Sequence, residues 1–136
     1  MKIVIDTNLW ISFLIGKKLS GLKNLLSNPN FTIYVCTELI EEIKKAISKP
    51  KIQKYLSADD EKDILELIDV FCIHIILYKK ATSPVRDAKD LFLLSLAETV
   101  QANYILTGDK DLLVLQTHNQ TKIISYSDFL GNIIIN

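Results

Sequence analysis

The sequence has few cysteines, no long hydrophobic run and no excess charge of either sign. Cys36 and Cys72 stand alone with no Cys-x-x-Cys motif, which excludes a cysteine-rich zinc module and a disulfide framework. No apolar run approaches the roughly 18 residues that a membrane helix needs. The first residues lack the long apolar region and cleavage site of a signal peptide. We therefore expect a soluble, cytoplasmic protein that does not associate with membranes.

The net charge is zero, because 16 basic residues balance 16 acidic residues. This balance argues against a protein that coats nucleic acid through bulk charge, so any nucleic-acid site must be a local patch. Residues 1–54 hold nine lysines and four acids, a local net charge of +5. With 49% hydrophobic residues, the 136-residue chain can bury a core, and we expect one domain over residues 1–136.

Short apolar segments alternate with helical patterns along the chain. Strands are expected at residues 2–5, 31–36, 73–77, 104–107 and 122–125. Helices are expected at residues 9–15, 19–27, 37–48, 52–56, 57–71, 87–100 and 109–115. This alternation predicts an α/β fold with a parallel sheet covered on both faces. The C-terminal Ile133–Ile135 is interpreted as a last strand or a packing tail.

Two aspartates, Asp6 and Asp109, each follow a buried-type strand and open a helical segment. The carboxyl ends of parallel strands lie along one edge of a sheet, so we expect the two carboxylates to be near neighbours there. Either residue alone is explained as a helix N-cap, which satisfies free backbone N–H groups. Their shared position weakens the N-cap interpretation.

Helix geometry selects Glu42 from the acids of residues 37–43. At 100° per residue, Leu39 and Ile43 lie on the buried stripe, and Glu42 lies at its border. Glu41 lies opposite the stripe and Glu38 lies in the first turn, where the helix dipole explains it. A border carboxylate can reach a cleft, although an ordinary salt bridge at the rim is the alternative.

A second pair of acids, Asp87 and Asp90, lies three residues apart at a helix start. Both project toward the N-terminal end of that helix. A capping-box-like turn explains the pair, although Glu or Gln is commoner at the second position. Asp90 also borders the core side of its helix, as Glu42 does.

An acidic cluster at one edge of the sheet needs a joint explanation. Carboxylates about 4 Å apart repel by roughly 4 kcal/mol per pair at an effective dielectric of 20. A cluster of oxygen ligands without Cys or His favours Mg²⁺ or Mn²⁺ over zinc. Such an ion suits the hydrolysis of phosphodiesters. His74 and His118 have no nucleophile or ligand partner at useful spacing, so a histidine mechanism is not expected.

The chain resembles the PIN-domain family, in the group of toxin components of toxin–antitoxin pairs. The motifs that carry the resemblance are Val4-Ile5-Asp6-Thr7-Asn8, Glu38-Leu39-Ile40-Glu41-Glu42-Ile43, Lys49-Pro50-Lys51, Asp87-Ala88-Lys89-Asp90, Ala102-Asn103-Tyr104-Ile105-Leu106-Thr107-Gly108-Asp109-Lys110-Asp111 and Ser127-Asp128-Phe129-Leu130. The resemblance implies a Rossmann-like three-layer α/β/α sandwich with a central parallel sheet, and a metal-dependent endoribonuclease activity. The family's acidic quartet matches Asp6, Glu42, Asp90 and Asp109.

The resemblance also implies roles for residues around the quartet. Asn8 and Thr107 fall at supporting polar positions, and Asp87 and Asp111 are candidates for additional acids. One departure is Cys36, where relatives often carry Ser at the end of the second strand. A cognate antitoxin is an expected partner, and homodimers are common in the family.

The mechanistic hypothesis gives Asp6 and Asp109 direct contact with a first Mg²⁺ or Mn²⁺, with Asp90 close by. Glu42 binds a second ion or orients the attacking water. The candidates for contact with RNA phosphates are Lys44, Lys45, Lys49, Lys51, Lys54, Arg86, Lys89 and Lys110. For each of these side chains a solvated surface position is the alternative. Trp10 either stacks on a base or packs in the core.

Two other functions stay open at this point. One is a non-catalytic PIN domain that binds RNA or protein. The other is a Mg²⁺-dependent phosphatase or phosphoacceptor at Asp6, which is disfavoured because no second acid lies two residues further along the chain.

Overall fold

The computed structural model describes residues 1–16, 18–77 and 88–135, without the side chains of residues 88–90 and 133–135. The strands are β1 (Lys2–Ile5), β2 (Thr32–Cys36), β3 (Cys72–Ile75), β4 (Tyr104–Leu106), β5 (Thr117–His118) and β6 (Thr121–Ile124). The helices are α1 (Thr7–Ile15), α2 (Leu19–Ser27), α3 (Thr37–Ile47), α4 (Pro50–Gln53), α5 (Asp60–Phe71), α6 (Ala88–Val100), α7 (Lys110–Leu113) and α8 (Tyr126–Ile135). The predicted alternation of strands and helices is confirmed.

The strands of the described residues form one sheet in the order β3-β2-β1-β4-β6-β5. All neighbouring pairs are parallel except β5 and β6, which are antiparallel. Strand β1 is central, and Ile3, Val4 and Ile5 are fully buried, as expected for a parallel strand with both faces covered. Ile5 lies beside Leu106 of β4, so the next residues along both strands emerge together at the carboxyl edge.

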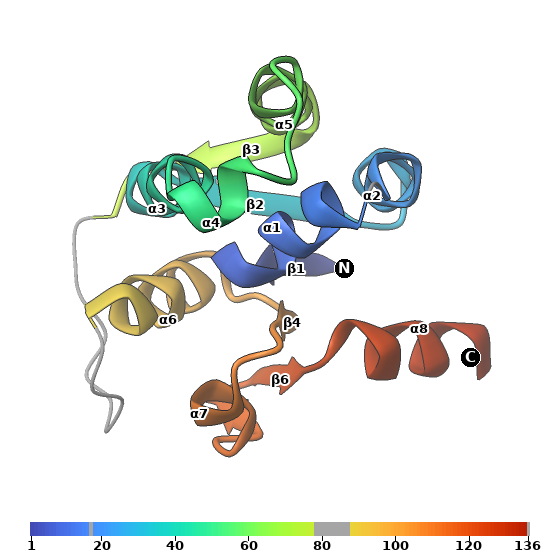
Figure 1. Cartoon of the computed structure of the whole chain (residues 1–136). Helices are drawn as coiled ribbons and strands as arrows, with labels where there is room; N and C mark the ends of the chain where they lie inside the picture. Colours follow the sequence, from blue (N-terminus) through green and yellow to red (C-terminus); the bar gives the residue numbers. More distant parts are fainter. Residues whose placement is uncertain (17, 78–87, 136) are drawn as a thin grey trace.

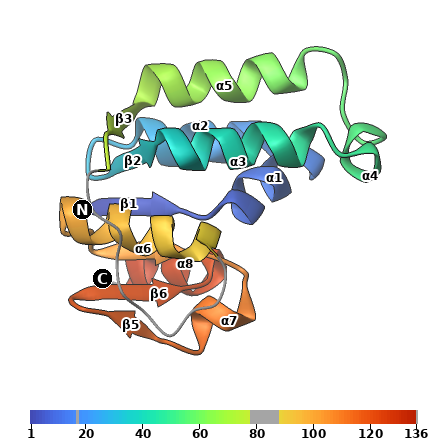
Figure 2. The same ribbon diagram turned by 90° about the vertical axis from the view of Figure 1, so that its left-hand side faces the viewer.

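Helices cover both faces of the sheet and produce three layers (Figures 1 and 2). Helices α3 and α6 lie on one face, and α2 and α8 lie on the other. This arrangement confirms the predicted α/β/α sandwich. Within the described residues, no helix is both long enough and apolar enough to cross a bilayer.

The largest buried side chains belong to Trp10 and Phe129. The Trp10 indole is fully buried and its Nε1 donates a hydrogen bond to the Ile5 carbonyl at 3.0 Å. Trp10 therefore packs in the core, and the alternative that it stacks on a base is wrong. Phe129 packs its ring against Tyr104 and Phe31, which fixes α8 on the sheet.

The expectation that the C-terminal segment forms a last strand is wrong. Ile133–Ile135 continue helix α8, which begins at Tyr126. The preference of β-branched residues for strands is context-dependent, and it does not determine the conformation here.

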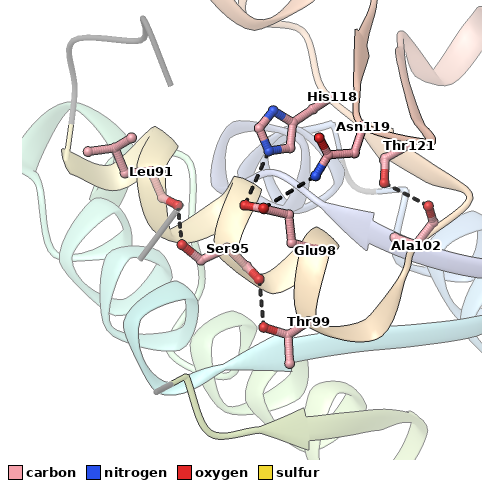
Figure 3. Close-up of polar contacts among 8 residues, drawn as sticks. All are labelled: Leu91, Ser95, Glu98, Thr99, Ala102, His118, Asn119 and Thr121. Atoms are coloured by element: carbon pink, nitrogen blue, oxygen red, sulfur yellow. Dashed lines mark hydrogen bonds and ion pairs between the residues drawn. The ribbon is translucent and has the colours of Figure 1, made fainter. Parts of the chain in front are cut away.

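Strand β6 matches the strand expected at residues 122–125, whereas β5, which is only two residues long, is not indicated by the sequence pattern. His118 lies in β5 with its Nε2 3.2 Å from Glu98 Oε2 of α6. The amide of Asn119 donates to the same carboxylate, and buried Thr121 donates to the Ala102 carbonyl at 2.7 Å. Figure 3 shows these contacts, which attach the hairpin to α6 and to the loop before β4.

Candidate active site

Asp6 lies at the junction between β1 and α1, where the residue is 8% exposed. Its backbone carbonyl accepts hydrogen bonds from the N–H groups of Leu9 and Trp10, so Asp6 is the N-cap residue of α1. The Asp6 side chain makes no capping hydrogen bond. The N-cap interpretation therefore accounts for the backbone of Asp6 but does not account for its buried carboxylate.

The Thr107 hydroxyl joins Asp6 to Asp109. Thr107 is 1% exposed, and its Oγ1 donates to Asp6 Oδ2 at 2.7 Å. The same oxygen accepts a hydrogen bond from the backbone N–H of Asp109 at 3.0 Å. A hydroxyl has one proton, so donation to Asp6 leaves only acceptor capacity for Asp109. This directional link brings the loop after β4 to the end of β1, as predicted for the carboxyl edge.

The half-buried Asp109 fills its predicted N-cap role. Its Oδ1 accepts a hydrogen bond from the N–H of Asp111 at 2.9 Å, and this bond caps α7. Within the described part of the chain, its other carboxylate oxygen has no hydrogen-bond partner. Capping orients the carboxylate while one oxygen stays available to a ligand.

The supporting and additional polar residues lie close in sequence to this pair. Asn8 is in the first turn of α1 with an exposed side chain, and Asp111 and Lys110 are exposed in α7. Helices α1 and α7 both start at the carboxyl edge, so these residues follow Asp6 and Asp109 in the first turns of the two helices. No hydrogen bond within the described residues links the Asn8 side chain to either acid.

Glu42 occupies the border position predicted from helix geometry. It is half-buried on α3, whereas Glu38 and Glu41 are exposed and Leu39 and Ile43 are buried. Helix α3, which carries Glu42, packs against α1 and α6. Among the described side chains, however, no three acidic, His or Cys groups form a metal-ligand set.

The remaining acid of the predicted quartet is known only by its backbone. Asp90 lies in the first turn of α6, and its side chain is outside the described residues. Helix α6 contacts β1, and its N-terminal end lies on the side where the strands end (Figure 2). Asp87, Arg86 and the Lys89 side chain also lie outside the described residues.

The donor chemistry of this edge fits a hard cation. Asp6 and Asp109 supply carboxylate oxygens, and Thr107 links the two residues through its hydroxyl oxygen. Oxygen ligands of this kind select Mg²⁺ or Mn²⁺ over softer metals. Residue reasoning from the strand ends identified both acids, but it did not foresee the link through Thr107. The signal was present in the Thr107-Gly108-Asp109 spacing, which is typical of a hydroxyl-supported turn.

Comparison with known proteins identifies the family of the chain. A family model described as the PIN domain matches residues 2–111. The uncharacterized protein MJ1680 of Methanocaldococcus jannaschii is 32% identical over 124 residues, covering 88% of this chain and 78% of that protein.

Two solved structures share the fold. One belongs to the VapBC2 complex of Rickettsia felis bound to a fragment of its promoter DNA, with a TM-score of 0.58 and 15% identity. That match covers 93% of this chain and 99% of the other. The second is a domain of a functionally unknown protein of Methanocaldococcus jannaschii, with a TM-score of 0.54, 15% identity and coverage of 92% and 89%. The chain belongs to the PIN-domain family.

Proposed function

We propose that this protein is a metal-dependent endoribonuclease that hydrolyses RNA phosphodiester bonds, and that residues 1–136 form one PIN domain. The observation that carries the proposal is the hydrogen-bonded link from buried Asp6 through Thr107 to Asp109. Two acids held together at the carboxyl edge of a parallel sheet form a rigid start of a metal site. Family membership supports the same chemistry.

The metal is Mg²⁺ or Mn²⁺, and the residues that would hold it are Asp6, Asp109 and Asp90. When bound, the ion would neutralise charge on the phosphate and make the attacking water more acidic. Glu42, on α3, would hold a second ion or orient that water. Asp87 and Asp111 are additional acids in this proposal, and Asn8 is a supporting polar group.

Thr107 acts through Asp6 and positions it. Its hydroxyl holds Oδ2 of that carboxylate at 2.7 Å and so fixes the orientation of the Asp6 side chain. Lysines at the same side of the molecule attract the RNA backbone, with Lys44, Lys45, Lys49 and Lys110 as candidates beside Arg86. Their charge positions the phosphates and carries no sequence information.

The partner in the cell is proposed to be an antitoxin protein, which would make this chain the toxin of a toxin–antitoxin pair. Support comes from the fold shared with a chain of the VapBC2 complex of Rickettsia felis. The proposal includes a homodimer, which the family resemblance suggests. The alternative to the whole proposal is a PIN domain that binds RNA or protein without cleaving it.

The decisive experiment measures cleavage of end-labelled RNA by the full chain with Mg²⁺, with Mn²⁺ and with EDTA. We expect cleavage that needs the metal and is lost in Asp6→Asn and Asp109→Asn. Glu42→Gln should also lose most activity. Its matched control is Glu41→Gln, one residue away on the exposed side of α3, which should cleave like the wild type.

Two outcomes would contradict the proposal. Intact RNA with every metal, in a protein that still binds that RNA, would favour the binding module. Equal cleavage by wild type and Asp6→Asn would assign the activity to another site or to a contaminant.

A further inference from the structure

A basic surface lies on the segment that follows Glu42 in α3. Residues 43–58 contain five lysines and no acid. These residues, named here the basic segment, include the end of α3 and all of α4. The lysines are Lys44, Lys45, Lys49, Lys51 and Lys54, and all five are exposed.

None of these five ammonium groups forms an ion pair with a residue that the structure describes. Lys62 and Glu66 of α5, by contrast, form an exposed pair at 3.9 Å. Lys44 and Lys45 lie in the last turn of α3, where the helix dipole favours cations. That explanation does not extend to Lys49 and Lys54, which lie outside regular helix. The charge of the basic segment is therefore available to an external anion.

Tyr55 adds an aromatic ring to this surface. Its side chain is 50% exposed, and it is the only aromatic residue among the large exposed hydrophobic residues of the described chain. The Lys54 ammonium lies 5.1 Å from the centre of the ring, within cation–π range. The half-exposed ring and a phosphate-binding ammonium group therefore belong to the same surface, with Lys54 over the ring. Grooves that bind single-stranded nucleic acid combine these two features.

The basic segment lies beyond the carboxyl edge of the sheet, which is the edge that carries the candidate active site. Helix α3 starts where β2 ends and runs away from the strands, and α4 follows at its far end (Figure 2). From Glu42 to the end of α3 at Ile47, the helix rises by about 8 Å. A strand of RNA that passes Glu42 therefore reaches the basic segment within a few nucleotides.

We propose that the basic segment is a docking site for single-stranded RNA, in which Tyr55 stacks on an unpaired base and the neighbouring lysines bind the flanking phosphates. This inference rests on the proposed function for its choice of RNA. It implies that the enzyme takes its substrate as a single strand, because a duplex keeps its bases stacked internally. An acidic protein segment would use the lysines equally but would gain less from a half-exposed ring on an open surface.

The test measures binding of a fluorescently labelled single-stranded RNA, about 12 nucleotides long, to the full chain in EDTA by anisotropy. Without a divalent metal the RNA stays intact, so binding is separated from cleavage. Tyr55→Ala should weaken binding about fivefold to twentyfold, and Tyr55→Phe should keep the wild-type affinity. Val114→Ala is the matched control, since Val114 is an exposed apolar residue in a different region, just after α7.

Two further probes identify the kind of contact. A duplex RNA of the same length should lose less than about twofold in affinity in Tyr55→Ala. Lys→Gln changes at positions 49, 51 and 54 should reduce the salt dependence of single-strand binding by about 0.7 in slope per lysine. Lys62→Gln, on α5, should leave that slope unchanged. Thermal melting checks that each variant is folded.

The inference fails if Tyr55→Ala binds single-stranded RNA like the wild type, or weakens duplex and single strand equally. It also fails if the variants keep RNA binding but lose binding to an acidic protein partner. The proposed function can fail separately. If RNA binding does not depend on Tyr55 but metal-dependent cleavage is normal, only the docking site is overturned. If RNA binding depends on Tyr55 but no metal-dependent cleavage occurs, only the nuclease is overturned.

Discussion

One side chain, that of Thr107, determines how two acids of the candidate site are held. Thr107 uses its single proton for Asp6 and an oxygen lone pair for the Asp109 N–H. Both partners come from different strands, so this hydroxyl couples the ends of β1 and β4. Because Thr107 is almost fully buried, loss of the hydroxyl would leave polar groups without a replacement from water.

Replacing Thr107 separates its positioning role from simple packing. Thr107→Val keeps the shape but removes both hydrogen bonds, so we expect RNA cleavage to fall about 10- to 100-fold. The free energy of unfolding should fall by about 1–3 kcal/mol. Thr107→Ser restores the hydroxyl and should recover most of the activity, measured as single-turnover cleavage. A Val variant that cleaves normally, or a Ser variant that does not recover, would assign Thr107 no positioning role.

The thiols of Cys36 and Cys72 make the free energy of unfolding depend on pH in the alkaline range. Burial raises the pKa of the Cys36 thiol to about 11 and that of Cys72 to about 12, from 9.0. The folded protein thus retains protons that the unfolded chain releases above pH 9. Stability from this source is complete below pH 9 and is lost as the pH rises toward 11–12.

Urea unfolding at pH 8 and pH 10 measures this loss. Between pH 8 and pH 10 the free energy of unfolding of the wild type should fall by about 3 kcal/mol more than that of the double variant Cys36→Ala/Cys72→Ala. The comparison removes the shared titration of lysines and tyrosines. Parallel pH dependence in the two proteins would show that the thiols ionise as easily in the folded state as in the unfolded state.

At the scale of elements, the sequence predicted the strands and helices that have a periodic pattern of apolar residues. The central strand and the amphipathic helix α3 carry their burial pattern in their own residues, so their bounds agree with the expectation to within one residue. Strand β5 is too short to carry a period. Its turn uses Asn119 with a positive φ of 54° rather than an Asn-Gly pair. Such elements depend on tertiary contacts, which a local pattern does not contain.

The hairpin of β5 and β6 offers a test of such a tertiary contact. Thr121→Val removes the buried hydrogen bond to the Ala102 carbonyl and should lower the free energy of unfolding by about 1–3 kcal/mol. Thr99→Val is the matched control, because exposed Thr99 only bonds back within α6 to Ser95. That change should cost less than about 0.5 kcal/mol in urea unfolding. Equal costs would mean that the hairpin is held mainly by other contacts.

At the scale of the molecule, the candidate site is assembled from segments far apart in sequence. The positions of Asp6, Asp109 and Glu42 could be predicted, because strand ends and helix faces follow from local pattern. The separation between their carboxylates could not, since it depends on how α3 and α6 pack against the sheet. The sequence also left open which acidic side chains cap helices. In the structure the Asp109 side chain caps α7, whereas the Asp6 side chain does not cap α1.

Metal binding should therefore appear in the stability of the whole fold. A ligand that binds only the folded state stabilises it by RT ln(1 + [L]/Kd), about 2.7 kcal/mol at one hundred times Kd. We expect millimolar Mg²⁺ or Mn²⁺ to raise the melting temperature by several degrees, measured by scanning calorimetry. Asp109→Asn should blunt that rise while its amide oxygen still caps α7.

The melting temperature of the metal-free protein depends on the same carboxylates. If neighbouring carboxylates repel one another without the ion, Asp109→Asn should melt at or above the wild-type temperature in EDTA, and below it in Mg²⁺. Asp69→Asn, on the exposed side of α5, should shift neither curve. A wild-type melting temperature that stays constant on titration with either ion would mean that these carboxylates do not share a cation.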